Sequence, residues 1–312
     1  MPSLTPREQF ALHRAINCLV AVVLLICCFY PGPAPASENL VEQGKYLFYT
    51  AGCAGCHSSN QPLAGGRRIE TSLGTFYAPN ISLDREQGIG GWTEEDFCRA
   101  LNDGKSPTGE NYFPAFPYTS YTKMTASDKS ALWAYIKSQP AIATENRPHD
   151  LPWFIFSRKL VGIWKLGRFT PGAYTDDPTK SREWNRGAYL ATAVAHCGEC
   201  HTPRGPLGGM RNGRYLAGNV NGSDGANVPN ITQDTHTGIG SWSRHELITF
   251  LATGQCPDGS HAQGLMAEVL ATGVMRLTED DRDALATYLL SVPPVNQDMV
   301  SPPGPFADLD EF

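Results

Sequence analysis

The residues most able to do chemistry in this sequence are two pairs of cysteines, each followed directly by a histidine. The first group is Cys53-Ala54-Gly55-Cys56-His57, and the second is Cys197-Gly198-Glu199-Cys200-His201. The pattern C-x-x-C-H is typical of c-type haem attachment. Its two thiols add across the vinyl groups of one porphyrin, and the adjacent imidazole becomes the proximal ligand of the iron. The sequence therefore predicts two covalently bound haem c groups, with their irons ligated by His57 and His201.

Structural zinc and a redox dithiol are the other uses of paired C-x-x-C motifs. A zinc site would need all four thiols in one small module, whereas the two pairs lie far apart in the 312-residue chain. A redox dithiol does not require a histidine at the same place in both copies. Haem attachment accounts for both observations, and it is the interpretation that we favour.

The segments around the two motifs also occur twice. A helix is expected directly before each motif, over residues 38–50 and 184–195. Gly44 and Gly187 occupy the same place in these two helices and would let each helix cross a neighbour closely. After each motif come a Pro-Asn-Ile tripeptide and a Gly-Ile-Gly-x-Trp block, which start at Pro79 and Gly88 in the first copy and at Pro229 and Gly238 in the second.

Two further helices are expected in each copy, because a capping residue precedes an apolar periodic run. Thr93 and Ser243 cap the earlier helix of each copy, and Thr125 and Thr278 cap the later one. Internal similarity over this length indicates a duplication. The predicted fold class is therefore all-α, with two tandem class I cytochrome c domains from an apparent duplication and little or no strand.

The remaining segments complete the predicted domain organisation. Cytochrome c domain 1 covers residues 37–140 and domain 2 covers residues 183–295, with a signal peptide at 1–36, an apolar connector at 141–182 and an acidic, Pro-rich tail at 296–312. The connector holds an apolar run at 153–166, which exceeds what a linker needs. We expect this run to brace the two domains, and any exposed part of it to form a docking surface for a partner.

The N-terminal segment has the order of a secretory signal peptide. Two arginines precede an apolar run at 16–30, and Ala34 and Ala36 fit the small-residue rule for cleavage before Ser37. The run is short beside the roughly 20 residues of a spanning helix. The sequence therefore predicts export to the periplasm, with peripheral membrane association or an uncleaved anchor as the alternative.

Composition narrows the classes of partner and activity. A hydrophobic content of 41% is enough for packed cores, and the formal net charge is −6. A moderately acidic chain argues against a nucleic-acid partner and suits attraction to a basic redox partner. We recognise no Ser/His/Asp triad, phosphate-binding loop or carboxylate pair in the sequence.

Two prolines and two tryptophans are candidates for further haem contacts. A carbonyl beside the haem often accepts the ring N–H of the proximal histidine, and Pro62 and Pro206 follow their motifs at equal spacing. Trp92 and Trp242 could pack on a haem edge and donate their indole N–H to a propionate. An ordinary turn proline and a core tryptophan are the alternatives.

The chain resembles the dihaem cytochrome c family, and within it the cytochrome subunits of membrane-bound, quinone-reducing alcohol, gluconate and sugar dehydrogenases. The resemblance covers residues 38–295 and is carried by the two C-x-x-C-H motifs, the repeated blocks, the segment 116–124 and the segment 266–269. It implies an electron-transfer subunit that works with a dehydrogenase. Subunits of that family usually carry three haems, whereas this sequence has two motifs.

The distal ligands complete the predicted iron sites. Met124 is the one methionine between Asn111 and the third helix of the first copy, so we expect it opposite His57. In the second copy Leu277 occupies the equivalent position, and the family resemblance points to Met266 as the ligand opposite His201. Met275 and, more weakly, His261 are the alternatives, and core filling is the other use of a methionine here.

Two classes of function follow from these sites. The favoured one is a periplasmic dihaem c-type cytochrome that takes electrons from a dehydrogenase or other donor and passes them toward a quinone, a soluble cytochrome or a terminal oxidase. The alternative is a dihaem redox enzyme of the peroxidase or thiosulfate-dehydrogenase type. That alternative requires one open or displaceable distal position.

Overall fold

The computed structural model describes residues 36–59, 61–71, 73–152, 158–205 and 208–297. Met1–Asn39 form one unit, and the chain from Leu40 onward forms a second unit that contains both C-x-x-C-H motifs. The described residues leave out most of the predicted signal peptide (1–36) and most of the predicted tail (296–312). They also leave out residues 153–157 of the connector.

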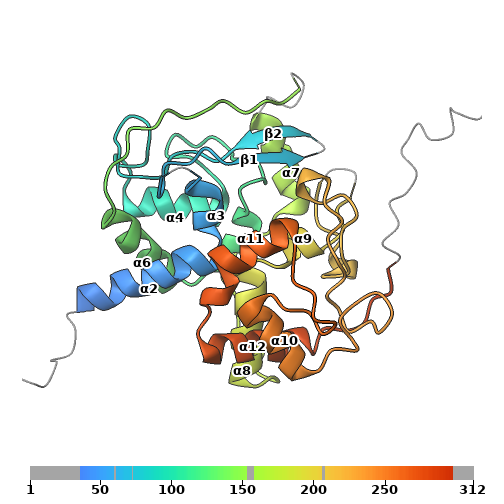
Figure 1. Ribbon diagram of the computed structural model, residues 1–312. Coiled ribbons are helices and arrows are strands. Elements are labelled where there is room, and N and C mark those ends of the chain that lie inside the picture. Colours follow the sequence, from blue (N-terminus) through green and yellow to red (C-terminus); the bar gives the residue numbers. More distant parts are fainter. Residues whose placement is uncertain (1–35, 60, 72, 153–157, 206–207, 298–312) are drawn as a thin grey trace, which may run out of the picture. The chain divides into compact units, whose positions relative to one another are not determined.

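Helices make up most of the regular structure (Figure 1), as the predicted helical class requires. The α-helices are α2 (Ala36–Thr50), α3 (Cys53–His57), α4 (Glu94–Asp103), α5 (Tyr118–Tyr121), α6 (Ala126–Lys137), α7 (Arg158–Arg168), α8 (Arg182–Tyr189), α9 (Gly198–His201), α10 (Arg244–Thr253), α11 (Gly264–Thr272) and α12 (Glu279–Leu289). A π-helical turn, η1 (Leu190–Val194), continues α8, and the short 3-10 helices are η2 (Asn212–Arg214), η3 (Ser223–Gly225) and η4 (Val274–Arg276).

Four helices begin at the capping residues that the sequence indicates. Thr93 before α4 and Ser243 before α10 each accept a hydrogen bond from the backbone N–H three residues on. Both form complete capping boxes, because Asp96 in α4 reaches back to the cap N–H as a glutamate would. Thr125 and Thr278 cap α6 and α12 in the same way through their side chains. The predicted starts of these helices are confirmed.

A two-stranded antiparallel sheet departs from the all-α expectation. Strands β1 (Arg68–Thr71) and β2 (Gly74–Tyr77) pair from Arg68 opposite Tyr77 to Thr71 opposite Gly74. An isolated hairpin is marginally stable in water. Here Thr75 exchanges two backbone hydrogen bonds, of 2.8 and 2.9 Å, with Asp150 of the connector. The connector thus supports a sheet whose four-residue strands are too short to give a clear alternating pattern in the sequence.

Each helix that precedes a motif crosses the last helix of its own half at backbone contact. A Cβ atom on Gly44 of α2 would lie 1.8 Å from the carbonyl oxygen of Ala131 in α6. A Cβ atom on Gly187 of α8 would lie 1.9 Å from the carbonyl oxygen of Ala284 in α12. Helices α8 and α12 lie side by side (Figure 1). Only glycine permits these two crossings, and the two crossings match.

Buried side chains from the two halves form one continuous apolar core. It includes Leu47 and Phe48 of α2 and Leu132 of α6 from the first half. From the second half it includes Leu190 of η1 and Leu285 of α12. The two copies therefore pack against one another through apolar surface.

Two reciprocal hydrogen bonds also join the halves. The hydroxyl of Tyr46 in α2 donates to the carboxylate of Asp281 in α12 at 2.6 Å. The hydroxyl of Tyr189 in α8 donates to the carboxylate of Asp128 in α6 at 2.5 Å. Arg186 adds two hydrogen bonds to Asp281, at 2.7 and 2.6 Å. The helix before each motif is thus fastened to the last helix of the other half.

We predict that the Asp281 carboxylate makes the stability of the fold depend on acid pH. Burial by itself would raise the pKa of Asp281, but hydrogen bonds from Arg186 and Tyr46 outweigh it and hold the pKa below 3.8. A depressed folded pKa gives stability that is present at neutral pH and is lost as the pH falls through and below about 4. Replacing Asp281 by asparagine should lower the free energy of unfolding at pH 7 by about 2 kcal/mol.

Denaturant unfolding of wild type and Asp281→Asn at several pH values checks this prediction. The difference between the two proteins should shrink as the pH falls from 5 toward 3. A difference that stays constant over that range would show that the charge of Asp281 does not contribute.

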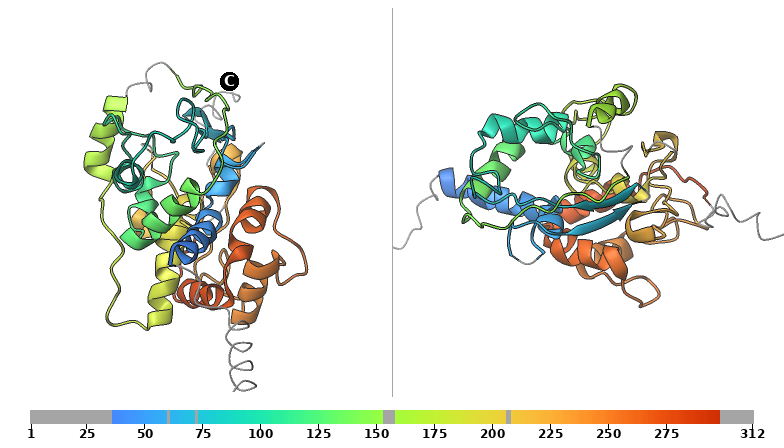
Figure 2. Two further views of the ribbon diagram at one scale, coloured as in Figure 1. Left: turned by 90° about the vertical axis from the view of Figure 1, so that its left-hand side faces the viewer. Right: turned by 90° about the horizontal axis from the view of Figure 1, so that it is seen from above.

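The connector contacts both halves. Lys165 of α7 donates to the backbone carbonyl of Asp103 in the first half at 2.6 Å. Farther along, the backbone N–H of Tyr174 donates to the carbonyl of Lys123 at 2.9 Å. The hydroxyl of Tyr174 donates to Asn185 of the second half, also at 2.9 Å. The connector is therefore packed structure, with α7 at the edge of the ribbon in both views of Figure 2.

Candidate haem-binding sites

Each C-x-x-C-H motif forms a single helical turn. In the first motif Cys53, Cys56 and His57 lie in α3, which Gly52 introduces with a left-handed backbone at φ 72°. In the second motif Cys197 is the residue before α9. A spacing of three residues puts both thiols of a motif on one face of the turn, where they can reach the two vinyl groups of one porphyrin. The described cysteines are free thiols, not disulfides.

The two motif histidines are held in the same way. Nδ1 of His57 lies 2.7 Å from the carbonyl oxygen of Pro79, and Nδ1 of His201 lies 2.8 Å from the carbonyl oxygen of Pro229. When Nδ1–H donates to that carbonyl, Nε2 carries no hydrogen and keeps its lone pair. In a histidine ligand of this tautomer, Nε2 is the atom that can bind iron. Burial lowers the pKa of both histidines and so favours the neutral, ligating form, although the two carbonyls oppose it in part.

These contacts correct the expected carbonyl partner in the first motif. Pro62 is exposed, and the hydrogen bond of His57 goes to Pro79 in its place. Pro206 lies outside the described residues, and His201 bonds to Pro229. The acceptor comes from the Pro-Asn-Ile block more than twenty residues later, because the chain folds back over the histidine.

A buried asparagine fixes each of these carbonyls. Asn80 is 2% exposed, accepts the N–H of Ser82 at 2.8 Å and donates to the carbonyl of Ile142 at 2.6 Å. Asn230 is also 2% exposed and makes the equivalent pair of bonds, to the N–H of Thr232 and the carbonyl of Val295. Each asparagine therefore ties the loop beside its histidine to the segment after the last helix of its half. Sequence reasoning missed this role, although the repetition of Pro-Asn-Ile signalled it.

Met124 lies three residues after the end of α5 in the first half. Its side chain is completely buried, and its N–H donates to the carbonyl of Tyr121 at 3.0 Å. The hydroxyl of Tyr121 donates to the carbonyl of Ala51 at 2.6 Å, two residues before Cys53. The turn that carries Met124 is thus fastened to the loop between α2 and α3, directly before the motif.

The second half places its candidate ligands differently. Leu277, at the position of Met124, is buried. Met266 in α11 and Met275 in η4 are both half-buried and both pack against the core. The methyl group of Met275 faces Gly254, since a Cβ there would lie 3.3 Å from it, whereas His261 is exposed. Met266 as the ligand opposite His201 stays a prediction.

Trp92 and Trp242 occupy matching places. Each is half-buried and packs against the core, and each backbone N–H donates to the isoleucine of its Gly-Ile-Gly block. The ring of Trp242 meets Phe250 edge-on, with the centroids 5.4 Å apart. A contact of either indole with haem stays a prediction.

The two motifs approach each other where the halves meet. Burial is the main cause that raises the pKa of Cys56, and the thiol of Cys200 from the other motif adds to the rise. Helix α11 lies against α3, where Thr272 would be 3.6 Å from a Cβ on Gly55. Glu268 of α11 also forms an ion pair with Arg67. Nε2 of His196, directly before the second motif, lies 3.2 Å from the carbonyl oxygen of Ala51, two residues before the first motif, so the attachment sites are neighbours across one interface.

Glu199, inside the second motif, is a further residue near the site that sequence reasoning did not single out. Its carboxylate accepts hydrogen bonds from the hydroxyls of Thr119 and Ser120 of the first half at 2.5 and 2.6 Å. Arg204 pairs with it at 2.6 Å. Burial by itself would raise the pKa of Glu199, but Arg204 and the two hydroxyls outweigh it, and the pKa lies below its ordinary value. An ionised carboxylate thus links the second motif to α5 of the first half.

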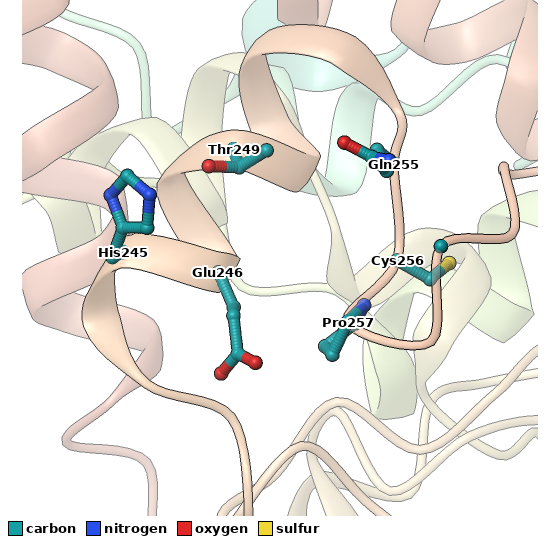
Figure 3. Close-up of a pocket in the computed structure, with 7 residues that line it drawn as sticks. His245, Glu246, Thr249, Gln255, Cys256 and Pro257 are labelled. Atoms are coloured by element: carbon teal, nitrogen blue, oxygen red, sulfur yellow. The ribbon is translucent and has the colours of Figure 1, made fainter.

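A surface pocket on α10 carries none of these residues. His245, Glu246 and Thr249 of α10 line one side, and the loop at 255–259 lines the other (Figure 3). The sulfur of Cys256 points away from the imidazole of His245 (Figure 3).

Among the described residues, no three His, Cys, Asp or Glu side chains are grouped as metal ligands. Within the same ranges, no helix has the length and apolar character needed to cross a bilayer.

Comparison with known proteins identifies the family. Residues 41–140 match the family model described as Cytochrome c. The chain is 38% identical to the "Diheme cytochrome c-type" of Cereibacter sphaeroides over 261 aligned residues. The alignment covers 81% of this chain and 86% of that protein. The chain belongs to the cytochrome c family. A covalently bound haem c fits the donor set of its motifs.

Other relatives of this cytochrome are subunits of dehydrogenases. It is 40% identical over 268 residues to the "Fructose dehydrogenase cytochrome subunit" of Gluconobacter japonicus, covering 84% of this chain and 54% of that protein. It is 35% identical over 268 residues to the "Gluconate 2-dehydrogenase cytochrome c subunit" of Pantoea cypripedii, covering 82% of this chain and 60% of that protein. The cytochrome thus spans little more than half the length of these subunits.

Proposed function

We propose that this cytochrome is a dihaem electron carrier of the periplasm. It takes electrons from a dehydrogenase partner and passes them toward a quinone, a soluble cytochrome or a terminal oxidase. The observation that carries the proposal is the matched pair of motif histidines, each oriented by a proline carbonyl with Nε2 left for iron. This matched geometry supports haem attachment at both C-x-x-C-H motifs.

The same matching supports a tandem duplication, with domains at 37–140 and 183–295. Gly44 and Gly187 make equivalent helix crossings. Leu63 and Leu216 both have a left-handed backbone, at φ 66° and 62°, in the loops after the motifs. Each of these two leucines accepts the N–H of the isoleucine in its Pro-Asn-Ile block. Shared strain at equivalent positions is expected of copies of one ancestral domain.

The residues of the chain supply what one-electron transfer requires. When bound, haem c provides an iron couple that gains and loses one electron. His57 and His201 would hold the proximal position, and the burial of Met124 would suit a distal ligand that keeps water and substrates out. The 3.2 Å contact between Nε2 of His196 and the carbonyl oxygen of Ala51, each beside a motif, supports electron exchange between the two attachment sites within one molecule.

The donor and the acceptor are inferred from the relatives. Fructose, alcohol and gluconate dehydrogenases have cytochrome subunits similar to this chain. A dehydrogenase subunit is therefore the proposed donor. The relative from Gluconobacter oxydans is named "Alcohol dehydrogenase (quinone), cytochrome c subunit", which supports a quinone as one acceptor. The N-terminal sequence supports export to the periplasm.

Carbon monoxide binding to the reduced, haem-loaded protein tests the carrier function against the enzyme alternative. If both irons are six-coordinate and closed, adding carbon monoxide should leave the spectrum of the ferrous protein unchanged. In a separate measurement, a high-potential electron acceptor should oxidise both haems of the protein fully. Rapid binding of carbon monoxide at one iron would reveal an open distal position, and the peroxidase or thiosulfate-dehydrogenase type of enzyme would then replace the carrier as the proposed function.

A further inference from the structure

Helix α7 turns three aliphatic side chains toward solvent and one of its lysines toward the protein. Leu160, Ile163 and Leu166 are 53%, 67% and 88% exposed. By contrast Lys165 is only 9% exposed, and Val161 is buried beside it. This is the reverse of the usual pattern, in which a surface helix buries its apolar stripe.

Polar contacts hold α7 in this orientation. The ammonium group of Lys165 donates to the carbonyls of Asp103 and Gly104 at 2.6 and 2.9 Å and to Asn111 at 3.0 Å. Arg158, at the start of the helix, donates to the carbonyl of Asn111 at 3.1 Å. Three acceptors satisfy the buried ammonium group, so rotating the helix to bury its leucines would break three hydrogen bonds and leave those acceptors without this donor. The outward apolar face is thus fixed by the fold.

The charge of α7 selects its partner. The helix contains four basic residues and no acidic one, in a chain whose formal net charge is −6. Arg158 and Lys165 are engaged with the protein, whereas Lys159 and Arg168 are exposed near the two ends of the apolar face. Aliphatic side chains flanked by exposed cations match an interfacial helix on an anionic membrane. The long cationic side chains can reach the headgroups while the leucines enter the acyl region.

We propose that the exposed face of α7, made of Leu160, Ile163 and Leu166 with Lys159 and Arg168, binds the surface of an anionic phospholipid bilayer. A bilayer accepts aliphatic chains from a convex helix without a matching groove. A protein interface, in contrast, gains most of its affinity from tryptophan, tyrosine and arginine anchors, and leucine, which supplies two of the three aliphatic side chains here, is under-represented among them. The proposal is independent of the number of haems and of the identity of the electron acceptor.

Photolabelling decides whether this face enters lipid. The haem-loaded full chain is mixed with vesicles of phosphatidylethanolamine and phosphatidylglycerol that contain a phospholipid with a diazirine on its acyl chain. After illumination, mass spectrometry should find adducts on the peptide covering α7, and vesicles of phosphatidylcholine alone should give at least about tenfold fewer. Adducts confined to other parts of the chain, such as residues 16–30, would overturn the proposal.

Matched variants show whether the exposed face of α7, and not non-specific adsorption of the protein to vesicles, causes the labelling. The triple variant Leu160→Gln/Ile163→Gln/Leu166→Gln should lower labelling of α7 at least about tenfold, because three apolar side chains no longer leave water. Leu73→Gln, which changes a 45% exposed leucine outside α7, should leave labelling of α7 unchanged. Lys159→Glu/Arg168→Glu should lower it on anionic vesicles. If α7 is never labelled but the triple variant no longer co-purifies with its dehydrogenase subunit, the face binds protein and not lipid.

Discussion

Replacing Met124 by leucine is expected to lower the reduction potential of the haem on His57 by on the order of 100 mV, because a methionine opposite histidine raises the potential of the iron. Met124 is completely buried, and leucine has a similar volume, so the core should stay packed. Covalent attachment should also persist, since Cys53 and Cys56 are unchanged. A potentiometric titration of the purified protein measures the shift.

The same substitution at two other positions assigns the second iron. Met266→Leu should remove about half of the near-infrared absorption that methionine ligation gives to ferric haem, as Met124→Leu should. Met275→Leu, the matched control in the same half, should leave that absorption intact. The opposite result at these two positions would assign Met275 as the ligand. Full absorption in Met124→Leu would show that this methionine is only core packing.

The second large effect is expected at the helix crossings. Gly187→Ala would put a Cβ 1.9 Å from the carbonyl oxygen of Ala284 and 2.8 Å from Cβ of Tyr288. Backbone cannot move aside as a flexible side chain can, so α8 and α12 must separate. We expect the free energy of unfolding to fall by about 3 kcal/mol, the upper end of the usual cost of overpacking. Gly44→Ala should act similarly through α2 and α6.

Denaturant unfolding of the haem-loaded protein measures this cost. Gly91→Ala is the control, because a Cβ there meets nothing within 4 Å and its backbone is not left-handed. It should change the free energy of unfolding by less than about 1 kcal/mol. Equal stability of Gly187→Ala and Gly91→Ala would show that the crossing tolerates a side chain and would remove one argument for equivalent halves.

Features encoded by neighbouring residues could be predicted from the sequence. Each C-x-x-C-H motif is contained in five consecutive residues. Each helix start depends on a capping residue and the next three residues, as at Thr93 and Ser243. The hairpin was missed because its support comes from Asp150, far along the chain from Thr75. Local pattern reasoning has no access to such a pairing.

Contacts between distant segments explain the other differences at the site. Pro62 was a reasonable candidate by proximity to His57, but the fold brings Pro79 to the imidazole. Glu199 occupies a variable position of its motif, and its partners Thr119 and Ser120 belong to the other half. Both errors have one physical cause, which is that tertiary packing and not chain order chooses hydrogen-bond partners.

The intact mass of the purified protein tests most directly whether both motifs hold haem. The spectrum should show two covalent haem additions in the wild type. It should show one in Cys53→Ser/Cys56→Ser and one in Cys197→Ser/Cys200→Ser, with the remaining haem on the unchanged motif. A wild-type protein with a single haem, or with zinc in place of haem, would contradict the dihaem account.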